Sequence, residues 1–130
     1  MTMDELEDTL PNGFHDSFLV SASVDYPAAT ACLEIDVDAD DPDPEVFQRV
    51  KLKLKGLCLF IIDPPDLSQN FSFGDTEWIN GDVTTEALLP KLEMYRQSVP
   101  AGSFFYSFFL RNWNSFIHVA AQDAELITDQ

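Results

Sequence analysis

Histidine is the side chain best suited to proton transfer or metal binding near neutral pH, and this chain has two, His15 and His118. His15 stands directly before Asp16 in the stretch LPNGFHDS. Because zinc takes three or four ligands from His, Cys and carboxylates, His15, Asp16 and His118 form a candidate metal site if the first and last strands meet. The alternative, which we favour, is a structural one: the PNG segment turns the chain, and His15 and Asp16 hydrogen-bond at that corner.

Nucleophilic catalysis needs a Ser or Cys with a base and a group that orients the base. The tripeptide HDS at 15–17 holds all three residue types, but neighbours on a strand point to opposite faces. The sequence contains no GxSxG, P-loop or GxGxxG motif. Cys32 is expected on an acidic outer face and Cys58 in the core, and neither position suits a nucleophile. We therefore expect no enzymatic activity and no cofactor.

The acidic stretch EIDVDADDPDPE, residues 34–45, invites comparison with a calcium-binding loop. An EF-hand loop that starts at Asp36 needs Gly at its sixth position and Glu at its twelfth, where the chain has Asp41 and Phe47. The EF-hand is thus excluded, and the simplest interpretation is a solvated loop stiffened by prolines. A looser divalent site stays open, with four acids as ligands: Asp40, Asp41, Asp43 and Glu45.

The charge balance limits the class of partner. The 130 residues include 23 acids and 7 bases, which gives a net charge of −16. Such a surface repels nucleic acid, whereas it suits a basic protein or simply keeps the domain soluble. The acidic start MTMDELEDTL does not have the pattern of a signal peptide, and no apolar run approaches the ~20 residues of a membrane span. Two cysteines without a CxxC pair fit a reduced, cytoplasmic protein.

The elements that position these residues follow from hydrophobic periodicity. Alternation with a period of two predicts strands over 16–26, 31–38 and 50–55, with Phe18, Val20, Ala22, Val24 and Tyr26 on one side of the first. The first two strands are expected to form a hairpin. Opposite charges predict the register of the next pair: Glu34 near Lys55, Asp36 near Lys53 and Asp38 near Lys51.

The second half of the chain adds a helix and further strands. LCLFIID, residues 57–63, is apolar on both faces, so it needs a cover, which a helix near residues 84–97 would supply. Pro90 would either kink that helix or begin its regular part. Strands are also expected near 76–79 and over 104–111 and 115–122, the last two joined at NWN.

The predicted fold is therefore α+β, a mainly antiparallel β-sheet of about five to seven strands with one packed helix near residues 84–97. Residues 1–130 form a single domain. Its ends, 1–9 and 124–130, are expected to be flexible.

The stretch LPNGFHDS, followed by an alternating strand, a DY turn and a second alternating strand, resembles the opening of a group of small uncharacterised bacterial proteins. The shared element is Gly-apolar-His-Asp followed by a β-hairpin, and the resemblance covers residues 10–38. Some similar small acidic proteins are proposed as immunity proteins of polymorphic toxin systems. The resemblance implies a bacterial cytoplasmic domain and transfers no catalytic residue.

Together these observations predict a non-enzymatic binding module, and within that class an inhibitor of a basic protein such as a secreted toxin domain. The expected contact residues are the acids Asp38, Asp40, Asp41, Asp43 and Glu45, with Trp78 and Trp113 as aromatic anchors. One alternative is a metal- or small-ligand-binding protein that uses His15, Asp16 and His118. The other is a homodimer or structural subunit joined through the apolar strand FFYSFFL.

Overall fold

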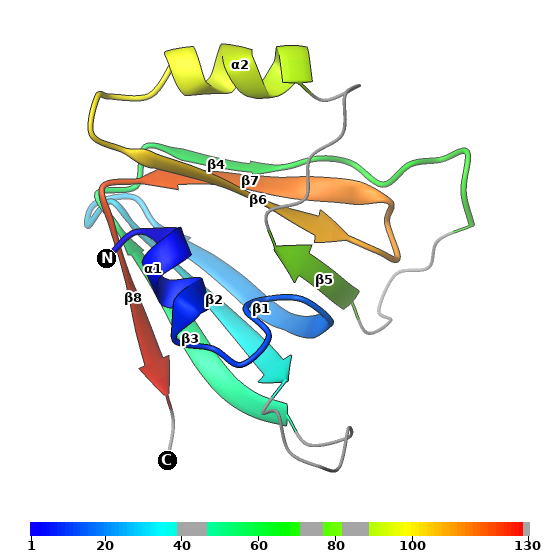
Figure 1. The fold of residues 1–130 in the computed structure, drawn as a ribbon. Coiled ribbons are helices and arrows are strands. Elements are labelled where there is room, and N and C mark those ends of the chain that lie inside the picture. Colours follow the sequence, from blue (N-terminus) through cyan, green and yellow to red (C-terminus); the bar gives the residue numbers. More distant parts are fainter. Residues whose placement is uncertain (39–46, 71–76, 82–88, 129–130) are drawn as a thin grey trace.

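A computed structural model describes residues 1–38, 47–70, 77–81 and 89–128 of the chain, and within them two helices and eight strands (Figure 1). In chain order these are α1 (Met3–Asp8), β1 (Ser17–Asp25), β2 (Thr30–Asp38), β3 (Phe47–Lys55), β4 (Leu59–Ile62), β5 (Glu77–Gly81), α2 (Leu89–Gln97), β6 (Phe104–Leu110), β7 (Ser115–Ala121) and β8 (Asp123–Thr128). Neither helix is long and apolar enough to cross a membrane.

All eight strands belong to one antiparallel sheet with the order β4-β7-β6-β5-β1-β2-β3-β8. The short strand β5 joins two halves, because it pairs with β1 only over Ser17–Leu19 and with β6 only over Phe108–Leu110. Figure 1 shows the sheet bent at this junction, so that β4, β7 and β6 lie above β1, β2, β3 and β8. The inner faces of the two halves and the buried side of α1 enclose the core.

The core consists of the inward row of each strand. On β2, Leu33, Ile35 and Val37 are fully buried while their neighbours in sequence are half-buried, as period-two alternation requires. Phe14, which precedes β1, is also fully buried and packs edge-on against Phe108 with ring centroids 5.6 Å apart. This aromatic contact ties the segment before β1 to the opposite half of the sheet.

The structure confirms the α+β class and the mainly antiparallel sheet, but the sheet has eight strands rather than five to seven. The added strand is β8, within the stretch 124–130 that we expect to be flexible, and Ala124 in it is buried. The other expected flexible end, 1–9, contains α1, whose Met3 and Leu6 are buried. Both ends are part of the fold because each contacts a distant segment. β8 pairs with β3, and α1 packs against β8. Residues 129–130 lie outside the described residues.

The expected helix over 84–97 is present as α2, Leu89–Gln97, and residues 82–88 lie outside the described residues. Pro90 stands in the first turn, where its missing N–H would be unpaired in any case, so the helix is not kinked by it. Figure 1 places α2 above β4, β7 and β6, and its Leu92 is buried. The helix therefore covers the second face of these strands, as the apolar run before it predicts.

The predicted charge register differs from the observed one. The lysines of β3 do lie on the same face as the acids of β2, but Glu34 is opposite Lys51 and Asp36 is opposite Arg49. The pairing is shifted because β3 begins at Phe47, which is opposite Asp38 and makes the connection shorter than expected. Arg49 takes the role expected of a lysine, with its guanidinium bound to the carboxylate of Asp36.

A second difference concerns the apolar row of β1. The register with β2 slips between Leu19 and Ser21, as at a β-bulge, so Val20 leaves the alternation. Phe18 then lies on the outer face opposite Asp36, whereas Val24 lies on the inner face opposite Ala31. The five apolar residues that alternate in the sequence therefore do not form one row: Phe18 is on the outer face, Ala22 and Val24 are on the inner face, and Tyr26 lies in the turn beyond β1.

Candidate functional site

A serine, a histidine and an aspartate form one hydrogen-bonded chain beneath α2. Ser107 Oγ lies 2.7 Å from His118 Nδ1, and His118 Nε2 lies 3.0 Å from Asp63 Oδ2. Lys91 of α2 donates to the other carboxylate oxygen of Asp63 at 2.7 Å. His118 is fully buried and Ser107 is 3% exposed. The chain of contacts thus joins β6, β7, the end of β4 and α2.

Strand pairing brings these groups together. Ser107 and His118 are directly opposite each other on β6 and β7, and Ile61 of β4 is opposite His118 on its other side. Asp63 follows β4 immediately, so its carboxylate reaches the second ring nitrogen of His118. The imidazole itself is packed among aromatic rings, with Phe105, Phe116 and Tyr95 at centroid distances of 6.1, 5.7 and 5.5 Å.

The protonation state follows from burial and from the hydrogen bonds. Burial lowers the pKa of His118 below its ordinary value, and the opposing hydrogen bond to Asp63 is the smaller effect. The neutral ring carries its proton on Nε2, because an ionised Asp63 can only accept. Nδ1 therefore accepts from the hydroxyl of Ser107. On the far side of the carboxylate, the hydrogen bond that Lys91 donates to Asp63 raises the pKa of Lys91.

These are the residue types of a serine hydrolase, but the access that such chemistry needs is missing. A nucleophilic hydroxyl must reach the substrate, and Ser107 is buried beside a ring that Tyr95 of α2 covers. Serine proteases also place the serine on Nε2 and the aspartate on Nδ1, the reverse of the arrangement around His118. Among the described residues every buried side-chain nitrogen and oxygen has a hydrogen-bond partner. The network satisfies these groups and fastens α2 to the sheet.

The proposed metal ligands His15, Asp16 and His118 are not brought together. His15 and Asp16 are exposed in the turn before β1, where the backbone N–H of Asp16 donates to Asn80 Oδ1 at 2.9 Å. The carboxylate of Asp16 lies 4.0 Å from the guanidinium of Arg111. Within the described part of the chain, no three His, Cys, Asp or Glu side chains are grouped as metal ligands. The geometry fits the turn interpretation of LPNGFHDS.

Only some of the expected partner contacts fall on described residues. Asp40, Asp41, Asp43 and Glu45 lie outside them, and Asp38 is the last residue of β2. Trp78 is half-buried, with its ring centroid 3.6 Å from that of Phe18 and 5.7 Å from the guanidinium carbon of Arg111. Trp113 is also half-buried and packs against the core. The two tryptophans are therefore packed into the fold rather than presented as free anchors.

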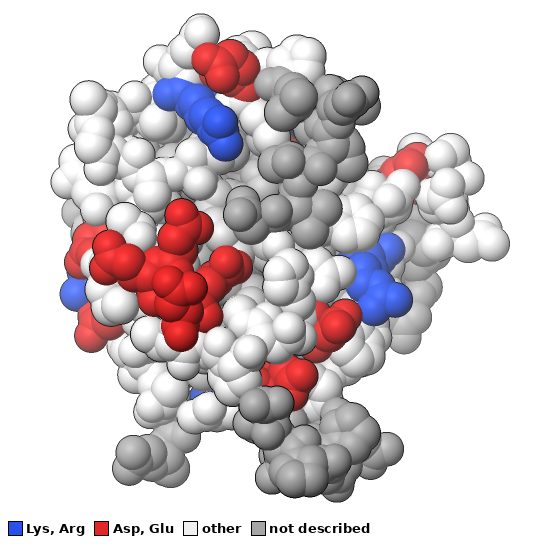
Figure 2. Space-filling model, viewed as in Figure 1, with Lys and Arg blue, Asp and Glu red and all other residues white. Residues whose placement is uncertain are grey.

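Negative charge is left over on the surface after the chain has paired its own cations. Figure 2 shows carboxylates gathered over α1, and among the described residues Asp4, Glu5 and Asp8 of this helix form no ion pair. The basic residues, in contrast, are mostly engaged with carboxylates of the same chain: Arg49, Lys51, Lys55, Lys91 and Arg111. With most of its cations already paired within the chain, the surface keeps a large excess of negative charge.

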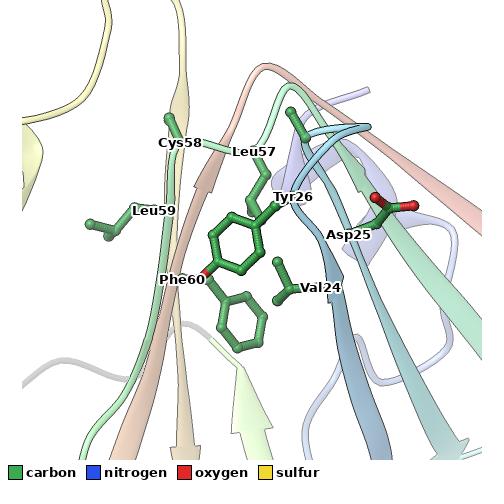
Figure 3. A pocket seen from close by; sticks show the side chains of 8 residues that line it. Val24, Asp25, Tyr26, Leu57, Cys58, Leu59 and Phe60 are labelled. Atoms are coloured by element: carbon green, nitrogen blue, oxygen red, sulfur yellow. The ribbon is translucent and has the colours of Figure 1, made fainter.

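A cleft of about 230 Å³ opens between the end of β1 and the start of β4 (Figure 3). Its lining residues are Val24, Asp25, Tyr26, Ala29, Leu57, Cys58, Leu59 and Phe60. Figure 3 shows Val24, Tyr26, Leu57 and Phe60 directed into the space between the strands, whereas Asp25 and Cys58 point away from it. The expectation that Cys58 lies in the core is wrong, because its side chain is exposed. The cleft is thus an apolar depression on the inner side of the bent sheet.

The cleft exists because the upper half of the sheet does not cover the end of β1. Val24 and Ala31 are opposite each other on the inner face, yet Val24 is 37% exposed and Ala31 only 2%. Tyr26, in the turn that follows β1, is 88% exposed. The N–H of Leu57 donates to the carbonyl of Ala29 at 2.8 Å, which joins two of the residues that line the depression.

Asp63 and Ser107 were not predicted as hydrogen-bond partners of His118, nor Lys91 as the second partner of Asp63. One signal was available, since Ser107 and His118 are each a polar residue within an apolar strand. The expected NWN turn does not give their register: β6 ends at Leu110 and β7 begins at Ser115, and only this four-residue turn, 111–114, places Ser107 opposite His118. Asp63 and Lys91 offered no such signal, because their contacts depend on how β4 and α2 lie on β7. The cleft was also not predicted, because Val24 and Tyr26 were assigned to one row of the first strand, whereas Leu57 and Phe60 were assigned to a separate strand with no predicted contact to it.

Comparisons with protein-family models, with curated proteins and with solved structures found no match to this chain. Function is therefore inferred from the fold and the side chains themselves.

Proposed function

We propose that this chain is a non-enzymatic binding module whose partner is a basic protein. The observation that carries the proposal is the uncompensated negative charge: 23 acids stand against 7 bases, and most of the bases are engaged in ion pairs within the chain. A surface of one sign attracts an oppositely charged protein over a distance and accelerates its association. The burial of Ser107 and His118 supports a binding role rather than a catalytic one.

Within this class, an immunity-type inhibitor of a toxin domain is the specific role we propose, in agreement with the resemblance of residues 10–38 to small bacterial proteins. An inhibitor must capture its target quickly, and electrostatic attraction serves that need. Cys32 and Cys58 are both free thiols, which fits the reducing cytoplasm where such an inhibitor would act.

The proposal can be tested without knowing the partner. A library of random displayed peptides is selected on the immobilised chain at low salt, after removal of all peptides that bind an unrelated protein of equal net charge. Single selected peptides are then measured for affinity at low salt and at about 0.5 M salt, where exposed charges are strongly screened.

We expect the selected peptides to be enriched in Lys and Arg beyond those retained by the control protein, and to lose affinity at high salt. Selection of no peptide beyond the control, or of peptides without an excess of basic residues, would show that the acidic surface is not a recognition surface.

A further inference from the structure

We propose that the cleft between β1 and β4 receives an apolar side chain carried by a basic segment of the partner protein. This inference rests on the proposed function and deepens it, since it assigns the point at which the partner is anchored. Charge would attract the partner to the chain as a whole, and the cleft would set its position.

The size of the cleft suits a side chain. Its volume of about 230 Å³ lies below the range of roughly 300–1,000 Å³ that is typical of small-molecule pockets. The hydrogen bond between Leu57 and Ala29 joins the two segments that line the cleft and so holds its walls in place. Val24, Leu57 and Phe60 provide apolar walls for a group of aliphatic or aromatic character.

The exposure of these residues indicates that the surface is incomplete in the isolated chain. Along β2 the inner face is fully covered, since Leu33 and Ile35 have no exposed surface. At the neighbouring end of β1, Val24 and Tyr26 remain open to solvent. Burial of such residues on binding releases water from apolar surface, and tyrosine is among the residues that contribute most at protein interfaces.

Charge decides which occupant fits. Asp25 is the charged residue that lines the cleft, and its side chain points away from the depression. The lining contains no Lys or Arg. A second copy of this chain would bring a further net charge of −16 to the same place, which repulsion opposes. A segment with an apolar side chain flanked by basic residues meets no such penalty.

The test compares two variants that add the same charge to the same strand. Val24→Asp places a carboxylate in the cleft. Val20→Asp places a carboxylate at a position that does not line the cleft and is similarly accessible, since Val24 is 37% exposed and Val20 is 45% exposed. Tyr26→Ala serves as an independent second variant, because its ring is 88% exposed and its loss leaves the core intact. The probe is a basic peptide selected on the wild-type chain, and its affinity is measured by fluorescence anisotropy.

We expect Val24→Asp to lower the affinity for the peptide by at least about tenfold, and we expect Tyr26→Ala to lower this affinity as well. Val20→Asp should change the affinity by less than about twofold. The added negative charge favours a basic peptide in both aspartate variants, so a loss confined to Val24→Asp cannot be electrostatic in origin.

Other results would overturn the assignment. Val24→Asp and Val20→Asp could bind the peptide with equal affinity while binding to the wild type remains sensitive to salt. This result would show that the partner binds by charge at another place, so the proposed function would stand without the cleft. A wild-type dimer in sedimentation that Val24→Asp dissociates would make a second copy the occupant. Failure to select any basic peptide would remove the proposed function itself.

Discussion

His118 Nε2 donates to Asp63 Oδ2 across 3.0 Å, and this contact holds a neutral imidazole in a fully buried position between two strands and a helix. The aspartate is shared, since Lys91 of α2 donates to its other oxygen. A single carboxylate therefore links the polar interior of the sheet to the helix that covers it. The stability of this part of the fold should depend on the proton that His118 takes up.

The first prediction concerns pH. Because the folded pKa of His118 is lowered by burial, the unfolded chain binds this proton at a higher pH than the folded one. The stabilising contribution is complete above the unfolded pKa of about 6.5 and is lost as the pH falls below it. Urea unfolding from about pH 7.5 to pH 5 should show a falling free energy for the wild type and a flatter dependence for His118→Gln.

The control for this experiment is His15→Gln, which removes the exposed histidine and should keep the wild-type dependence. Lowering the pH also makes the net charge of −16 less negative, but this change affects the wild type, His118→Gln and His15→Gln alike. Parallel curves for the wild type and His118→Gln would contradict the assignment.

The second prediction separates the two partners of the shared carboxylate. Asp63→Ala leaves the buried N–H of His118 without an acceptor and should cost about 1–3 kcal/mol of unfolding free energy. Lys91→Met should cost less than about 1 kcal/mol, because the lysine side chain is 38% exposed, an ion pair open to solvent contributes little, and Asp63 keeps its contact with His118. Chemical denaturation of both variants and of the double variant measures the coupling. A Lys91→Met cost as large as that of Asp63→Ala would show that the ion pair, not the histidine contact, dominates.

The third prediction concerns the amino-terminal helix. Leu6 of α1 is buried in the core, so Leu6→Ala should destabilise the chain by about 2–5 kcal/mol through lost burial and the cavity left behind. Glu5→Ala, next to it on the exposed side, should change stability by less than about 0.5 kcal/mol. Thermal or urea unfolding of the two variants checks this. Similar small effects at both positions would mean that α1 does not contribute to the stable fold.

The fourth prediction concerns a close approach inside the core. A Cβ at Gly81 would overlap the hydroxyl of Tyr106, which is hydrogen-bonded to Glu7, so Gly81→Ala should destabilise the chain by about 1–3 kcal/mol. Tyr106→Phe removes that hydroxyl and should recover part of the loss in the double variant. A double-mutant cycle of unfolding free energies measures the recovery, and strictly additive effects would place the strain elsewhere.

Local pattern was sufficient to predict much of the sheet. β2, β3, β6 and β7 lie where apolar alternation or apolar runs place them, since burial of every second side chain follows directly from strand geometry. Local pattern did not predict α1 and β8, because each is short and its place in the fold depends on a distant segment: α1 contacts β8, and β8 pairs with β3. It also misjudged the register of β2 and β3, because charge pairs constrain a register less than the length of the connecting loop does.

The candidate site was predictable only in part. His118 stood out in the sequence, but grouping it with His15 and Asp16 required the first and last strands to meet. Its hydrogen-bond partners come from β6 and from the end of β4, and Lys91 of α2 donates to the carboxylate that His118 contacts. Asp63 lies 55 positions away from His118 along the chain, and only the pairing of β4 with β7 brings them into contact.

The sequence by itself determined the net charge of −16, the alternation of the strands and the α+β class, because these depend on residue types and on neighbours a few positions apart. The tertiary structure alone decided which apolar residues are covered. Val24 and Ala31 occupy equivalent inward positions on paired strands, yet only Ala31 is buried. Whether an inward side chain is covered depends on the opposite half of the sheet, which is built from distant parts of the chain, and no local pattern records where that half ends.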